Sequence, residues 1–209
     1  MKKVPCGLYI ISPQSFKLSE FKEQLKDALA GGKVAVFQLR MKDVADSEII
    51  EACKVLIPIC HAAGTQFILN DYVHLAKMVG ADGVHIGIED ISIDAARAEL
   101  GKNKVIGVSC YDDGDRAIDA AEAGADYVAF GAFYDTNTKI PRGRPAPEIL
   151  KWWASNSVVP CVAIGGIKPH NCAPLVEAGA DFIAVVTAIW DDADGAKDAV
   201  RKMLGAMRL

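Results

Sequence analysis

Three polar side chains stand two residues apart at the end of an apolar stretch. Gln38, Arg40 and Lys42 follow the run Val34-Ala-Val-Phe37, and on a β-strand this spacing puts all three on one face. A strand that stays buried offers no partner for two cations and an amide, so this face must open where the strand ends. The row predicts an anionic ligand at the carboxyl end of a strand. The alternative is a strand that runs out into a solvated loop.

Polar residues collect in the same way after the other apolar runs. They are Asn70, Asp71, His85, Glu89, Asp90, Ser109, Thr136, Thr138, Lys139, Gly165, Gly166 and Thr187. Carboxylates favour a hard cation such as Mg2+, whereas arginine and lysine favour phosphoryl oxygens. A substrate set with two phosphate sites and one divalent cation would satisfy all of them.

Each of these signals also has a simpler interpretation. Gly165-Gly166 would serve as a turn, Asp90 as a charge near a helix N-terminus, His85 as a hydrogen-bonded core histidine, and 136–139 as a solvated loop. Their joint placement favours a site. The sequence shows neither a Ser/His/Asp arrangement nor a His/Cys cluster, so we do not expect covalent catalysis.

The elements that must position these residues alternate between strand and helix. The expected strands are Leu8 to Ile11, the stretch from Val34, Gln66 to Asp71, Val84 to Ile86, Val105 to Val108, Val128 to Phe130, Val158 to Ile164 and Ile183 to Val186. The expected helices are Leu18 to Leu29, a helix capped by Asp46 and bent or broken near Pro58, Val73 to Val79, Ile93 to Leu100, Asp115 to Ala123, Pro147 to Trp153, His170 to Ala178 and Ala193 to Met207. Eight such units predict an α/β fold, a closed (β/α)8 TIM barrel.

A short repeat, Gly-Ala-Asp, precedes three of the expected strands. It occurs at 80–82, 124–126 and 179–181, each time after a helical stretch. Glycine suits the left-handed conformation at a helix C-terminus. Polar residues at the carboxyl ends of the barrel strands are therefore expected to meet at one mouth, where TIM barrels carry their chemistry.

Composition fits one barrel domain over residues 1–209. The net charge of −4 argues against a nucleic-acid surface, and no apolar run has the length of a signal segment or of a membrane span. The six cysteines show no C-x-x-C spacing, which is typical of reduced thiols in a cytoplasmic protein. We expect small phosphorylated molecules as partners, no nucleic acid and no membrane. A homo-oligomer remains open.

Several motifs together resemble one family over nearly the whole chain. They are Gln38-Leu-Arg-Met-Lys42, Leu69-Asn-Asp71, Gly83-Val-His-Ile-Gly87 with Glu89-Asp90, Gly107-Val-Ser109, Thr136-Asn-Thr-Lys139 and Ala163-Ile-Gly-Gly-Ile167. This order of motifs closely resembles thiamine-phosphate synthase. The resemblance implies a (β/α)8 barrel that joins hydroxymethylpyrimidine diphosphate to hydroxyethylthiazole phosphate, with Mg2+, and releases diphosphate and thiamine phosphate.

The resemblance also implies a role for each matching residue. The contacts for the pyrimidine diphosphate would be Gln38, Arg40, Lys42, Asn70, Ser109 and Lys139. Four of these, Arg40, Lys42, Ser109 and Lys139, would act on the leaving diphosphate as catalytic residues. Asp71 and Asp90 would bind Mg2+. The thiazole phosphate would be held by Thr136, Asn137, Thr138, Gly166, Val186 and Thr187.

This chain departs from the family pattern at four positions. The family often has Gln, Pro, Pro and Ser where this chain has Ile88, Ala132, Asp135 and Thr187. Thr187 keeps a hydroxyl. Asp135, however, adds negative charge beside the expected phosphate, and without proline the loop is expected to be freer.

Two other functions are compatible with the sequence. One is a thiazole tautomerase of the same fold family, which would need no diphosphate or Mg2+ site. The other is a non-catalytic paralogue that binds thiamine phosphates. Retention of Asp71, Asp90, Arg40, Lys42 and Lys139 argues against the tautomerase.

Overall fold

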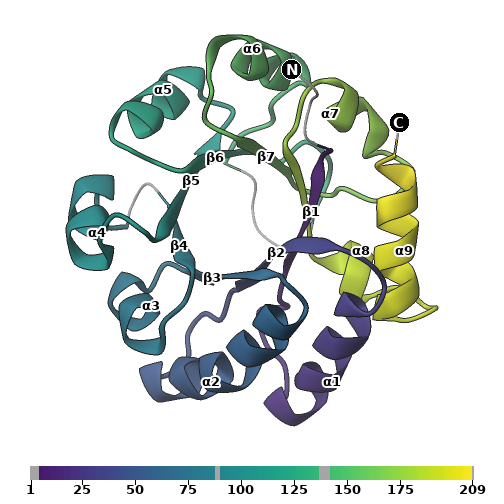
Figure 1. Cartoon of the computed structure of the whole chain (residues 1–209). Coiled ribbons are helices and arrows are strands. Elements are labelled where there is room, and N and C mark those ends of the chain that lie inside the picture. The colour runs from purple at the N-terminus through teal and green to yellow at the C-terminus, as the bar shows by residue number, and fades with distance from the viewer. Residues whose placement is uncertain (1–4, 88–89, 137–141, 209) are drawn as a thin grey trace.

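Eight parallel strands close into a barrel inside a ring of helices (Figure 1). The computed structural model of the chain describes residues 5–87, 90–136 and 142–208. The strands are β1 Gly7–Ile11, β2 Val34–Leu39, β3 Gln66–Asn70, β4 Gly83–Ile86, β5 Val105–Tyr111, β6 Tyr127–Phe130, β7 Cys161–Ile164 and β8 Phe182–Val185. Each strand pairs with its neighbour in the sequence, and β8 pairs with β1. The predicted (β/α)8 barrel is confirmed.

The helices follow the strands in the expected order. They are α1 Leu18–Leu29, α2 Asp46–Ala62, α3 Val73–Val79, α4 Ile93–Leu100, α5 Gly114–Glu122, α6 Glu148–Asn156, α7 Ala173–Glu177, α8 Thr187–Trp190 and α9 Ala196–Ala206. The last unit holds both the four-residue α8 and the longer α9. No helix within the described ranges is long and apolar enough to cross a membrane.

Several local predictions were wrong, among them the following. The helix of the second unit is not broken near Pro58 but continues to Ala62. Pro58 and Lys54, four residues earlier, lie on its exposed side, where water can hydrate the Lys54 carbonyl. Its N-cap is Ala45, not Asp46. The seventh strand begins at Cys161, three residues later than expected, and Val158 is fully exposed.

The Gly-Ala-Asp repeat ties helix ends to strands at the amino-terminal end of the barrel. In each copy the aspartate carboxylate accepts a hydrogen bond from a backbone N–H of the preceding strand: Asp82 from Phe67 at 2.7 Å, Asp126 from Ile106 at 2.8 Å and Asp181 from Cys161 at 2.9 Å. The aspartate N–H returns a bond to the carbonyl of the same residue. We call these three contacts the aspartate clasps. Each clasp fixes the register of one strand pair.

Alternation along the strands separates two apolar layers. Side chains such as Phe37 and Phe67 face outward and pack under the helices, whereas Tyr9, Ile68 and Tyr127 face into the barrel. The inner layer is crowded at glycine positions. A Cβ at Gly107 would collide with the ring of Tyr127, so Gly107 provides the space in which that ring crosses the barrel.

Gly107→Ala is expected to lower the free energy of unfolding by about 1–3 kcal/mol, the usual cost of overpacking a core. The change is measured as the denaturant midpoint at constant m-value. Gly205→Ala is the matched control, because Gly205 lies in α9 with no heavy atom near its added Cβ. The control should be neutral or slightly stabilising. A Gly107 variant as stable as the control would contradict the steric role.

Candidate active site

The predicted polar row lies at the carboxyl end of β2. Gln38 is buried, Arg40 is half-buried and the side chain of Lys42 is exposed over the mouth. The backbone of Arg40 is fixed by Ser12, whose buried Oγ accepts a hydrogen bond from the Arg40 N–H at 2.9 Å. Burial lowers the pKa of Arg40, although the nearby charge of Asp71 opposes that shift. An anionic ligand would compensate this partly desolvated cation.

Two carboxylates face each other beside the cations. Burial raises the pKa of Asp71, the charge of Asp90 raises it further, and Lys42 lowers it from a distance of 3.3 Å between Nζ and Oδ2. Asp90 accepts a hydrogen bond from the Gly87 N–H at 2.6 Å. Asp71 has a positive φ of 68°, a conformation that aspartate tolerates better than most residues. Two oxygen ligands held this close fit a hard divalent cation.

Asn70 leaves a hydrogen-bond donor for a ligand. It is the last residue of β3, it is 5% exposed, and it occupies an inward-facing position two residues after Ile68. Within the described ranges, its Nδ2 is the buried side-chain nitrogen that lacks a hydrogen-bond partner. Such a donor is costly to leave unpaired, so an acceptor on a bound molecule would stabilise it.

The residues predicted for the second phosphate meet on the opposite side of the mouth. Thr136, Gly166 and Thr187 line a cavity of about 510 Å³ formed after β6, β7 and β8, together with Lys168. Val186 directly precedes α8 and packs against the inner apolar layer. The predicted residues Asn137, Thr138 and Lys139 lie outside the described residues, as does Ile88.

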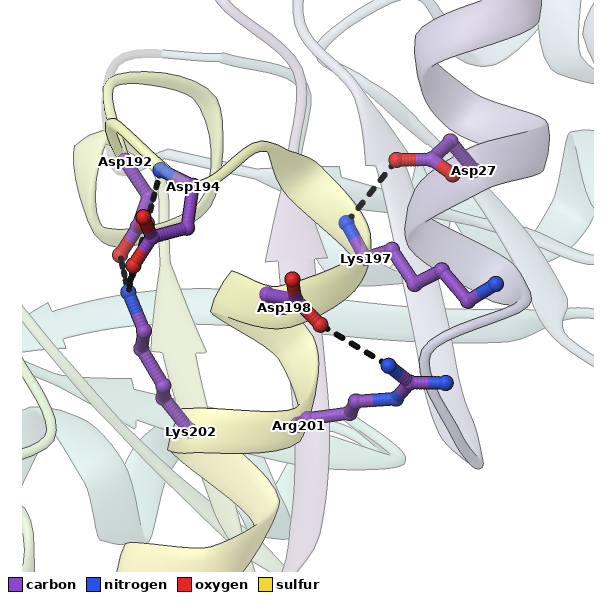
Figure 2. A network of polar contacts seen from close by, with 7 residues as sticks. All are labelled: Asp27, Asp192, Asp194, Lys197, Asp198, Arg201 and Lys202. Carbon is purple, nitrogen blue, oxygen red and sulfur yellow. Dashed lines mark hydrogen bonds and ion pairs between the residues drawn. The ribbon is translucent and has the colours of Figure 1, made fainter.

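Two of the three aspartates that line the cavity, Asp192 and Asp135, are paired with cations, and Asp191 is the third. Lys202 of α9 bonds both carboxylate oxygens of Asp192, at 2.8 and 3.0 Å, and also contacts Asp194 at 2.7 Å (Figure 2). The hydrogen bond from Lys202 lowers the pKa of Asp192. Figure 2 also shows the contact that joins this region to α1, in which Asp27 accepts a hydrogen bond from the Lys197 N–H at 3.1 Å.

Asp135 is paired in the same manner. Its carboxylate lies 2.6 Å from Nη1 of Arg144, so the charge expected to disturb a phosphate is partly neutralised. The loop before it is held at two points, because Phe133 and Tyr134 donate backbone hydrogen bonds to the carbonyls of Ile164 and Gly165 at 3.1 and 3.0 Å. These contacts hold residues 133 and 134, and the expectation of a freer loop at Asp135 stays a prediction.

Gly166 serves local packing as well as the cavity. It has a φ of 64°, and an added Cβ would collide with the carbonyl of Asp135. A side chain at this position would therefore displace the loop after β6 in addition to narrowing the cavity. Gly166 thus fits the turn interpretation and also lines the cavity.

Sequence reasoning missed two tyrosines that lie below the mouth. Tyr9 and Tyr127 meet inside the barrel, with 2.9 Å between their hydroxyl oxygens, and Gln38 donates to Tyr9 at 2.7 Å. His85 contacts Tyr127 through Nδ1 and Ser109 through Nε2, both at 2.9 Å. His85 is thus a hydrogen-bonded interior histidine that is joined to predicted site residues. The signal that the sequence offered for this interior contact was a hydroxyl-bearing residue, Tyr9, in an otherwise apolar strand two residues before Ile11.

Together these features define a (β/α)8-barrel protein whose mouth carries a charged region after β2 and β3 and a separate cavity after β6, β7 and β8. The family model described as thiamine monophosphate synthase matches residues 8–189. A thiamine-phosphate synthase from Rhodospirillum centenum is 46% identical over 203 residues, which cover 97% of this chain and 98% of the relative. This chain belongs to the thiamine-phosphate synthase family.

Other comparisons agree. A thiamine-phosphate synthase from Erythrobacter litoralis is 46% identical over 192 residues, covering 90% of each chain. The solved structure of a thiamine phosphate pyrophosphorylase from Pyrococcus furiosus has a TM-score of 0.83 and 30% identity, and the match covers 96% of this chain and 95% of that one. An orotidine 5'-phosphate decarboxylase from Pyrococcus horikoshii, at 13% identity and a TM-score of 0.71, shares the fold alone; that match covers 96% of this chain and 99% of the other.

Asp71→Asn is expected to raise the stability of the ligand-free protein at neutral pH. The pKa of Asp71 is raised in the folded state, so the ionised carboxylate opposes folding. The contribution of Asp71 to the free energy of unfolding is therefore favourable at low pH and is lost as the pH rises through the folded-state pKa. Asparagine keeps the size without the charge. The melting temperature should rise for the variant at pH 7, and the difference should shrink toward pH 4.

The matched control for this prediction is Asp43→Asn. Asp43 is exposed and also has a positive φ, of 59°, which asparagine tolerates. Its substitution removes a carboxylate that water already solvates, and should leave the melting temperature nearly unchanged. If Asp71→Asn were no more stable than this control at pH 7, the destabilisation of ionised Asp71 by burial and by the charge of Asp90 would be refuted.

Proposed function

We propose that this chain joins hydroxymethylpyrimidine diphosphate to hydroxyethylthiazole phosphate, giving thiamine phosphate and diphosphate. The observation that carries the proposal is the division of one barrel mouth into two regions. Arg40, Lys42 and the Asp71–Asp90 pair lie on one side, and the cavity lined by Thr187 lies on the other. Two differently phosphorylated substrates need two such regions, and the relatives are named thiamine-phosphate synthase and thiamine phosphate pyrophosphorylase.

The first region suits a leaving diphosphate. In the reaction, the methylene carbon of the pyrimidine loses its bond to a diphosphate oxygen and gains a bond to the thiazole nitrogen. Negative charge therefore develops on the diphosphate, where Arg40 and Lys42 can stabilise it with charge-assisted hydrogen bonds. Asn70 and Ser109 add a free amide donor and a hydroxyl at the same end of the barrel. Lys139 belongs to this set by resemblance alone.

The second region suits the thiazole phosphate. Thr136 and Thr187 supply hydroxyls to the cavity, and Lys168 supplies a cation. Because Asp135 and Asp192 are already paired with Arg144 and Lys202, they repel a phosphate less than free carboxylates would. Asn137, Thr138, Gly166 and Val186 complete the set proposed from the resemblance.

Mg2+ is part of this proposal, with Asp71 and Asp90 as its protein ligands. The fit rests on their chemistry, since two neighbouring carboxylates, one of which resists ionisation, offer oxygen atoms to a hard cation. No group of three or more potential metal ligands occurs within the described ranges, so substrate oxygens and water would supply the remaining ligands. Bound there, Mg2+ would neutralise charge on the diphosphate.

The cytoplasm as location and a homo-oligomeric state remain predictions. Cysteine chemistry supports the first, because the six cysteines are free thiols and burial raises the pKa of Cys53, Cys60 and Cys110 to about 12. Thiols held protonated in this way resist oxidation.

Arg40→Gln tests the diphosphate region. Loss of one charge-assisted contact should lower kcat/KM for coupling by about 10- to 150-fold, corresponding to about 1.5–3 kcal/mol. The assay follows thiamine phosphate and diphosphate together. Arg201→Gln is the control, because Arg201 pairs with Asp198 on the exposed face of α9 (Figure 2). Equal activity of the two variants would overturn the role of Arg40.

The same assay separates the competing functions. Coupling of both substrates by the wild-type protein supports the proposal. Isomerisation of the thiazole alone would instead identify a tautomerase, and binding without turnover would identify a non-catalytic paralogue.

Mg2+ binding is tested without turnover. Adding Mg2+ with inorganic diphosphate should raise the melting temperature of the wild-type protein, because a ligand that binds only the folded state stabilises it. Asp71→Asn and Asp90→Asn should each weaken this shift, whereas Asp43→Asn should retain it. A full shift in both site variants would rule out the two aspartates as ligands.

A further inference from the structure

Five side chains form one continuous hydrogen-bonded chain across the barrel. Its order is Gln38, Tyr9, Tyr127, His85 and Ser109, from strands β2, β1, β6, β4 and β5. The four contacts measure 2.7, 2.9, 2.9 and 2.9 Å. The two ends of the chain are residues proposed to contact the pyrimidine diphosphate, and the three middle residues have no role in the proposed function. We call this set the interior chain.

The middle of the chain is well buried. Tyr9 is 2% exposed and Tyr127 is 7% exposed. Their rings meet edge to face at 6.1 Å between centroids, and His85 stacks on Tyr127 at 5.6 Å. Burial raises the pKa of both tyrosines, so each keeps its single hydroxyl proton at neutral pH. The two tyrosines therefore contribute one hydroxyl proton each to the interior chain.

Counting these protons assigns a direction of hydrogen-bond donation to the interior chain. Four contacts need four hydrogens, but two phenols and an imidazole in its neutral form supply only three. At least one end must therefore donate into the interior chain, and when all three of these protons are used within it the other end accepts. In the structure Gln38 donates through Nε2 to Tyr9.

The remaining contacts follow from that first donation. Tyr9 then donates to Tyr127, and Tyr127 donates to Nδ1 of His85. The imidazole carries its proton on Nε2 and donates to Oγ of Ser109. Ser109 keeps its own hydroxyl proton for another acceptor. If the Gln38 amide were flipped so that its oxygen accepted from Tyr9, the direction of donation would reverse in all four contacts.

We propose that Tyr9, Tyr127 and His85 are positioning residues, which hold the Gln38 amide in one orientation and leave the Ser109 hydroxyl proton directed to the pyrimidine substrate. This inference rests on the proposed function for the identity of that substrate. Gln38 on β2 and Ser109 on β5 lie three strands apart, and neither can change from donor to acceptor without a change in the other. A heterocycle with the complementary donors and acceptors is then recognised at both ends together.

The first test is the tautomer of His85 in the ligand-free wild-type protein. Nitrogen-15 NMR of the imidazole distinguishes a proton on Nε2 from one on Nδ1. We expect the Nε2–H tautomer at neutral pH. The Nδ1–H tautomer or an imidazolium would overturn the proposed direction.

The second test changes a residue that is two hydrogen bonds away from His85 along the chain. Tyr9→Phe removes the hydroxyl that accepts from Gln38 and donates to Tyr127. The two remaining contacts, Tyr127 to His85 and His85 to Ser109, can then be donated in either direction. The His85 resonances should shift toward the average of the two tautomers. Thr65→Val is the control, because it deletes another buried hydroxyl, which donates to the Val34 carbonyl at 2.9 Å. Unchanged resonances in Tyr9→Phe would refute the coupling.

The third test measures whether the interior chain affects binding of the pyrimidine substrate during catalysis. Tyr127→Phe should raise KM for the pyrimidine diphosphate about 5- to 20-fold and leave KM for the thiazole phosphate within about two-fold. Equal increases for both substrates would indicate a packing role and contradict the inference. If the wild-type protein shows no coupling, the proposed function fails, whereas the two NMR tests still decide whether the interior chain has a direction.

Discussion

The contact between the hydroxyls of Tyr9 and Tyr127 is the interaction on which the geometry of the mouth depends. It joins β1 to β6 through the inside of the barrel, where these strands are not neighbours in the sheet. The contact requires the space left by Gly107, and it supports Gln38 and His85 from below. A buried hydroxyl pair is stable only when both groups are hydrogen bonded, so the position of each side chain constrains the others.

The sequence predicted the architecture well because it depends on short-range patterns. Short apolar runs and helix-ending glycines indicated all eight strands in order. The errors arose where solvent decides the outcome. Pro58 stays within a helix because its missing hydrogen bond faces water, and the exposed Val158 remains outside the strand although its residue type favours one.

The site was less predictable, because its contacts join distant parts of the chain. The sequence shows that Asp71 follows a strand, but it does not show that burial and the charge of Asp90 raise the pKa of Asp71. Likewise, the sequence makes Asp135 unfavourable beside a phosphate, and only the structure shows that Arg144 pairs with it. The two tyrosines resemble ordinary interior aromatic residues in the sequence, and only the three-dimensional arrangement shows that their hydroxyls meet.

The aspartate clasps have a consequence for how the barrel is assembled. They join β3 to β4, β5 to β6 and β7 to β8, so three successive pairs of strands carry the same fastening. Strand β2 is preceded by Gly31-Gly32-Lys33 in place of the repeat, and it is connected to the next pair through the Thr65 hydroxyl. The smallest repeating module of this architecture is accordingly two strands with their helices, and the barrel consists of three alike modules closed by a fourth of different construction.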